Sequence, residues 1–97
     1  MMDEQLREVE EIVRRLASER FPGAEILAIE VTDDVDFEDD EILKVRVVFR
    51  TPERHLDAKR TSGFVRHLRP RLSEMGLASM FPIMSFVSAD DYRELQT

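Results

Sequence analysis

The sequence predicts an α+β domain of two layers, in which two helices pack on one face of a three-stranded mixed sheet. Three observations point to this fold. An apolar stripe with helical spacing opens the chain, two segments with strand periodicity follow, and a second helical stripe precedes a third strand. The order is therefore α-β-β-α-β. With 97 residues, 42% of them hydrophobic, the chain can bury one modest core, so we expect a single domain over residues 1–97.

The first helix is expected over residues 4–21. Asp3 is its expected N-cap, and the Phe21-Pro22-Gly23 sequence ends it. Apolar residues recur every three or four positions and form one stripe: Leu6, Val9, Ile12, Val13, Leu16, Ala17 and Phe21.

The first two strands are expected over residues 24–32 and 41–50. In the first, Leu27, Ile29 and Val31 share one face. In the second, an apolar face alternates with a face that is basic except for one valine: Leu43, Val45, Val47 and Phe49 against Lys44, Arg46, Val48 and Arg50. Residues 33–40 between them contain neither Gly nor Pro, which predicts a long solvated hairpin loop rather than a two-residue turn.

The second helix is expected over residues 57–77, with Asp57 as N-cap and Gly76 just beyond its end. Pro70 falls nearly opposite the apolar stripe, on the solvent side. Either the helix bends at this proline, or the segment forms two short helices broken near Arg69.

The third strand is expected over residues 80–88, followed by a polar tail over residues 89–97 with about one helical turn. The strand is apolar on both faces, and such strands are covered on both. One face serves the core. We expect Val48, Met84 and Phe86 to lie on the other face and to form an interface with a second copy or a protein partner. The alternative is that the tail folds back over this face.

The net charge of −7 conceals an uneven distribution. Residues 1–41 carry 15 acidic and 4 basic side chains, a net of −11, whereas residues 42–97 carry 6 acidic and 10 basic, a net of +4. This distribution permits complementarity within the molecule or head-to-tail association, and it argues against a uniformly basic surface.

A local nucleic-acid surface is a second hypothesis. Basic residues on the second strand and second helix are placed to follow a phosphate backbone: Lys44, Arg46, Arg50, Arg66 and Arg69. The order of elements resembles KH-like RNA-binding folds of the second type, which implies RNA binding. The chain departs from that family in having no Gly-x-x-Gly loop, since its glycines are Gly23, Gly63 and Gly76.

A weak Ca²⁺ or Mg²⁺ site is a third hypothesis, because these ions prefer carboxylate oxygens. Its candidate ligands lie in the acidic segment: Asp33, Asp34, Asp36, Asp39 and Asp40. The segment lacks the central glycine and distal glutamate of an EF-hand, so a solvated hairpin tip is the simpler interpretation. His55 and His67 have no zinc-ligand spacing.

No catalytic motif stands out. The chain contains no cysteine, no signal-peptide pattern at its start and no apolar run long enough to span a membrane. We therefore expect a cytoplasmic, non-enzymatic domain without a strongly bound cofactor, which acts by association with itself or with another protein.

Overall fold

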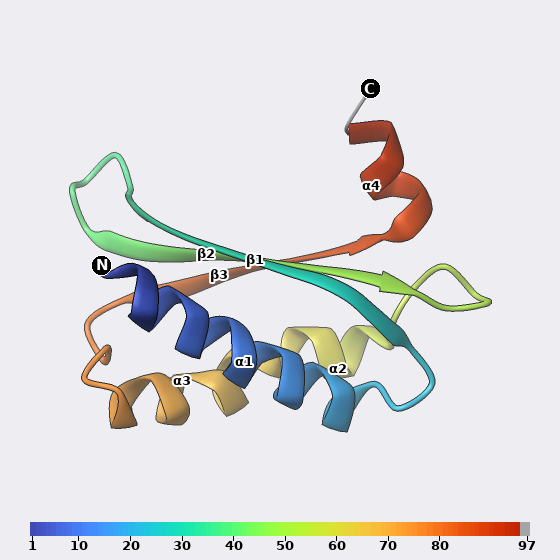
Figure 1. Cartoon of the computed structure of the whole chain (residues 1–97), viewed down its shortest axis with the longest axis horizontal. Helices are drawn as coiled ribbons and strands as arrows, with labels where there is room; N and C mark the ends of the chain where they lie inside the picture. The colour runs from blue at the N-terminus through green and yellow to red at the C-terminus, as the bar shows by residue number, and fades with distance from the viewer. Residues whose placement is uncertain (96–97) are drawn as a thin grey trace.

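The computed structural model describes residues 1–95. The predicted α+β class, the α-β-β-α-β order and the three-stranded mixed sheet are confirmed, with one helix divided in two and one added at the end (Figure 1). The elements are α1 (Asp3–Arg20), β1 (Glu25–Val35), β2 (Glu41–Arg50), α2 (Ala58–Ser62), α3 (Phe64–Glu74), β3 (Phe81–Ser88) and α4 (Ala89–Leu95).

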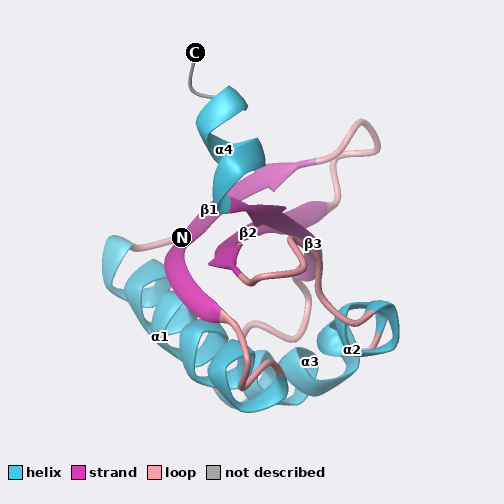
Figure 2. Ribbon diagram, turned by 90° about the vertical axis from the view of Figure 1, so that its right-hand side faces the viewer, coloured by secondary structure: helices cyan, strands magenta, loops and turns pink. Residues whose placement is uncertain are grey.

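The sheet has the order β1-β2-β3, with β2 in the centre. β1 is antiparallel to β2, and their connection is the acidic hairpin. β3 is parallel to β2, which requires a crossover, and α2 and α3 supply it. Helices α1, α2 and α3 lie on one side of the sheet, and α4 lies on the other, which we call the outer face (Figures 1 and 2).

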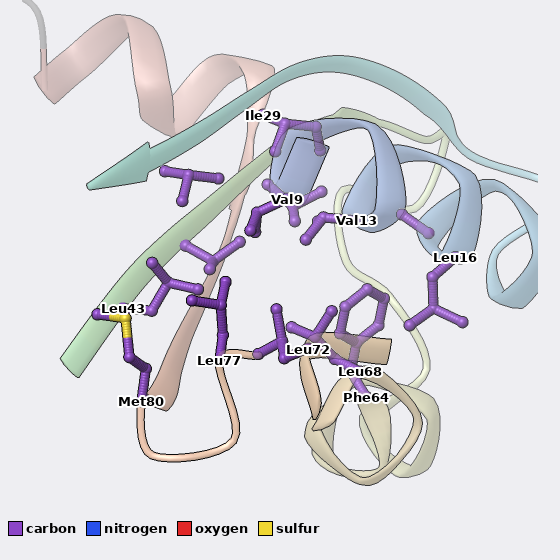
Figure 3. Packing of buried hydrophobic residues seen from close by; sticks show 14 of the residues in the cluster. Val9, Val13, Leu16, Ile29, Leu43, Phe64, Leu68, Leu72, Leu77 and Met80 are labelled. Atoms are coloured by element: carbon purple, nitrogen blue, oxygen red, sulfur yellow. The ribbon is translucent and has the colours of Figure 1, made fainter. Parts of the chain in front are cut away.

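The core lies between the sheet and the helices α1 and α3. Figure 3 shows Val9 and Val13 of α1 and Leu68 and Leu72 of α3 pointing into the space beneath the strands. Phe64 is fully buried, and its ring centroid lies 6.3 Å from that of Phe21 and 5.4 Å from that of Phe86. The predicted apolar stripes of both helices thus meet in one cluster.

The predicted second helix is divided at Gly63 and continues through Pro70, so the alternative of a break near Arg69 is wrong. Asp57 caps α2 as predicted, accepting hydrogen bonds from the backbone N–H groups of two residues in its first turn. At the end of α2, the hydroxyls of Thr61 and Ser62 donate to backbone carbonyls three residues earlier, and glycine follows. These three residues weaken the helix there, whereas Pro70 stays inside α3 on its exposed side.

Gly76 ends α3 as predicted. Its φ is 79°, its N–H donates to the carbonyl of Ser73, and the N–H of Leu77 donates to the carbonyl of Leu72 at 2.9 Å. This pair of bonds is the Schellman arrangement, which favours glycine because of the positive φ. At the start of the chain, Met2 rather than Asp3 is the N-cap of α1.

Two strands differ from the prediction in which side chains face the core. The β1–β2 register shifts between Ile26 and Ala28, so a bulge at Leu27 places Ile26 beside the core and Leu27 beneath α4. In β3, Met84 and Phe86 pack against the core, opposite Val45 and Val47 of β2. Their prediction as outer-face residues is therefore wrong, because both faces of β3 are apolar and the pattern alone cannot assign them.

The C-terminal segment is not a loose tail. Residues 89–95 form α4, which contacts β2 and β3 with one side and projects from the outer face (Figure 1). Residues 96–97 lie outside the described part of the chain. β1 extends to Val35, so the hairpin loop is shorter than predicted and spans residues 36–40. None of the described helices has both the length and the apolar character needed to cross a membrane.

Candidate functional site

α4 covers only one end of the outer face. Val48 lies beneath it and is 2% exposed, so this predicted interface residue is already covered within the chain. The hydroxyl of Tyr92 donates a hydrogen bond of 2.8 Å to Glu30 Oε2, and the guanidinium of Arg46 lies 6.0 Å from the centre of the tyrosine ring. Donation to a carboxylate raises the pKa of Tyr92 above its ordinary value of 10.0.

The basic residues predicted to bind nucleic acid fall into two groups on opposite sides of the sheet. Lys44, Arg46 and Arg50 lie on the outer face, and each has a carboxylate partner on β1. The three ion pairs are Lys44–Asp34 at 3.1 Å, Arg46–Glu30 at 3.2 Å and Arg50–Glu25 at 3.3 Å. Arg66 and Arg69 belong to α3, on the helical side. The structure therefore does not bring the five residues together into one basic surface.

The acidic residues predicted to bind a metal are also held apart. Asp33 pairs with the amino group of Met1 at 2.7 Å, which lowers the pKa of this carboxyl, and Asp34 pairs with Lys44. Asp36 Oδ1 accepts two backbone hydrogen bonds inside the loop. Within residues 1–95, no three carboxylates or imidazoles are placed to hold one ion.

The uncovered end of the outer face carries two half-exposed apolar side chains beside polar ones. Phe81 is 50% exposed and Ile83 is 46% exposed, at the start of β3 and next to the hairpin loop. Ile83 borders a hollow of about 460 Å³ over Thr32 and Lys44. Phe81 and Ile83 together border a second hollow, of about 620 Å³, beside the acidic loop. We call Phe81, Ile83 and the free edge of their strand the β3 surface.

The two edges of the sheet are unequal. β1 carries a bulge and several carboxylates, and Arg14 donates to the carbonyl of Ile26 at 3.3 Å. Bulges and charges are the features that keep an edge strand from pairing with another chain. β3 is also an edge strand, yet none of its eight residues is charged. Its one protective feature is Pro82, near its beginning.

Beyond β3, on the side of α3, there is a third hollow of about 640 Å³. Arg66 and Arg69 line it, and the guanidinium of Arg69 lies 5.4 Å from the centre of the Phe81 ring. Neither arginine has an ion pair within the described part of the chain. The arrangement suits binding of a chain that presents both apolar and acidic groups.

Sequence reasoning missed three residues of this region. Phe81 and Ile83 belong to an apolar face that could equally have served the core, and Phe37 was hidden among the acidic residues of the hairpin. The predicted hairpin already indicated that Phe37 is exposed, because a phenylalanine at a solvated hairpin tip cannot reach the core. Phe37 is 95% exposed.

Comparison with protein-family models, with curated proteins and with solved structures gave no match for this chain.

Proposed function

We propose that this protein is a protein-association module that binds through the β3 surface. The observation that supports this proposal is the exposure of Phe81 and Ile83 on an uncharged edge strand. The exposed halves of these two large apolar side chains contribute nothing to folding, whereas contiguous exposed apolar residues are typical of binding sites. The same residues are available for contact without any rearrangement of the core.

The free edge of β3 offers a second means of recognition. An extended segment of another chain can pair with an edge strand through backbone hydrogen bonds, and side-chain contacts on either face then provide specificity. On the outer face these contacts would be made by Ile83, and next to α3 by Phe81 and the two arginines. The contrast with the protected edge of β1 supports this assignment.

Nucleic-acid binding receives less support from the same arrangement. Neutralising phosphates requires cations that are free to pair. Lys44, Arg46 and Arg50 already face carboxylates, and the two unpaired arginines of α3 lie on the other side of the sheet.

A photo-crosslinking amino acid placed at Ile83, in the full chain in its native cells, tests the proposal. We expect a discrete adduct, identified by mass spectrometry as a second copy or a defined partner. The control is the same crosslinker at Leu95, an exposed apolar residue of α4 away from the β3 surface. With the crosslinker at Phe81, the substitution Ile83→Lys should abolish the adduct. Absence of any adduct from Ile83 would overturn the proposal.

A further inference from the structure

The hairpin loop presents an aromatic ring among free carboxylates. Asp36 Oδ1 accepts hydrogen bonds from the N–H groups of Glu38 and Asp40 at 2.9 and 3.0 Å, and the N–H of Asp39 donates to the Asp36 carbonyl. This turn holds Phe37 outward. Glu38, Asp39 and Asp40 form no ion pair within residues 1–95. An ordered loop loses little conformational freedom when it binds.

The hollow between α3 and the start of β3 has the complementary character. Its volume of about 640 Å³ lies within the range of about 300–1,000 Å³ that is common for ligand pockets. Arg66 and Arg69 contribute two positive charges that have no ion pair within residues 1–95, in a part of the chain (residues 42–97) whose net charge is positive. The apolar part of its lining consists of Val65, Pro70, Ala78 and Phe81.

The loop and the hollow lie at the same end of the sheet. Figure 1 shows the β1–β2 connection and the start of β3 on the same side of the molecule, away from α4. Phe81 borders both the hollow beside the loop and the hollow beside α3. Because the two features are neighbours on one surface, a two-fold axis through this region lets two copies exchange them reciprocally and closes the assembly as a dimer.

We propose that the β3 surface binds a second copy of this chain, with Phe37 of each copy in the α3–β3 hollow of the other and its flanking carboxylates facing Arg66 and Arg69. This inference rests on the proposed function and names its partner. Unpaired negative charge on one feature and unpaired positive charge on the other favour this occupant. Each phenylalanine ring buries roughly 150–250 Å². A stable interface needs about 1,200 Å² in total, so Phe81 and Ile83 must also take part.

Sedimentation velocity of the purified full chain tests the arrangement. We expect a dimer at about 100 µM, and Phe37→Ser should weaken it by about thirtyfold or more, as for a buried aromatic hot spot. Leu95→Ser, which also removes an exposed apolar side chain, should leave the dimer unchanged. The pair Arg66→Glu and Arg69→Glu should give a monomer. Arg7→Glu with Arg15→Glu on α1, an identical change in net charge, should not.

Charge exchange provides the decisive measurement. A variant with Glu38→Lys and Asp40→Lys should be monomeric alone, and so should the variant with both α3 arginines changed to glutamate. An equimolar mixture of these two variants should form a heterodimer, because both contacts again join opposite charges.

A wild-type monomer, a dimer that survives Phe37→Ser, or a mixture that stays monomeric would overturn the reciprocal dimer. None of these results would touch the proposed function, which fails only if Ile83 gives no crosslinked adduct. If Ile83 crosslinks to a different protein and the purified chain sediments as a monomer, the proposed association function stands. The proposal that the partner is a second copy of this chain is then rejected.

Discussion

The two ends of the outer sheet face are built from the same strands, but one end is covered by a helix and the other is exposed. At one end, α4 covers Val48, and the hydroxyl of Tyr92 donates a hydrogen bond to the carboxylate of Glu30. At the other, Phe81 and Ile83 remain half-exposed beside the hairpin loop. Both ends offer apolar side chains, so hydrophobicity alone does not explain the difference. The difference comes from the position of α4 in the chain. Its seven residues follow the last residue of β3 directly, so this short helix can cover only the end of the sheet where β3 stops.

Substitution by aspartate should separate the two ends most strongly. Val48→Asp places a carboxylate beneath α4 and should lower the free energy of unfolding by about 3 kcal/mol or more, because the buried charge has no partner. Ile83→Asp, on the same face, should change it by less than about 1 kcal/mol. Urea unfolding curves of both variants measure the contrast. Equal losses would mean that the two ends are covered alike.

Titration of Tyr92 should have a smaller effect, confined to the end of the outer face that α4 covers. The raised pKa means that the bond to Glu30 is intact below pH 10.0 and is lost as the pH rises through the higher folded value. The protection of the α4 amides against hydrogen exchange, relative to their intrinsic rates at each pH, should then fall, while that of amides near Ile83 should stay unchanged.

Near-ultraviolet absorbance follows this titration directly, since Tyr92 is the only tyrosine and the chain has no tryptophan. Glu30→Gln should lower the midpoint, because the negative partner is lost while Arg46 remains. Glu25→Gln, which removes the partner of Arg50, should leave it in place. A wild-type midpoint at or below 10.0 would contradict the contact between α4 and the sheet.

The smallest effect is expected at the uncovered end, from Asp34. The N–H of Val35 and the ammonium of Lys44 hold the pKa of this carboxyl below its ordinary value of 3.8. Its stabilising contribution is therefore present above pH 3.8 and is lost as the pH falls through the lower folded value. Asp34→Asn should flatten the acid dependence of stability slightly, because both partners are about half exposed and solvent screens the pair.

Urea midpoints between about pH 5 and about pH 2 record this dependence. Glu53→Gln, at an exposed carboxylate that forms no ion pair within residues 1–95, is the matched control and should leave the curve unchanged. An Asp34→Asn curve identical to the wild type would show that the pair with Lys44 contributes nothing.

Much of the fold could be predicted because its signals are local. The stripe from Val9 to Ala17, the alternation in β2, the Asp57 cap and the Gly76 end each depend on neighbours along the chain. The division at Gly63 was also local, but Pro70 looked like the stronger breaker. It is tolerated because its ring lies on the exposed side of α3.

The candidate site was much harder to predict, because it depends on which face of β3 meets the core. Phe81 and Ile83 lie on one face of β3, and Met84 and Phe86 lie on the other. A shift of one residue in the pairing of β3 with β2 would exchange the face that meets the core. The aromatic contacts of Phe86 with Phe21 and Phe64 decide between the two sets, and these partners are distant in the sequence.

The sequence by itself determined the three strands and the two main helical stripes, their order, the uneven charge and the exposed acidic hairpin, since these follow from local periodicity and composition. Only the tertiary structure decided that α4 covers Val48, that the basic residues of β2 are paired, and that Phe81 and Ile83 are left half-exposed beside the acidic hairpin loop. Each of these outcomes depends on contacts between segments far apart in the chain. The register of β1 against β2 brings the carboxylates to the basic residues. The register of β3 against β2 decides which apolar side chains of β3 face the core, and no pattern within β3 specifies it.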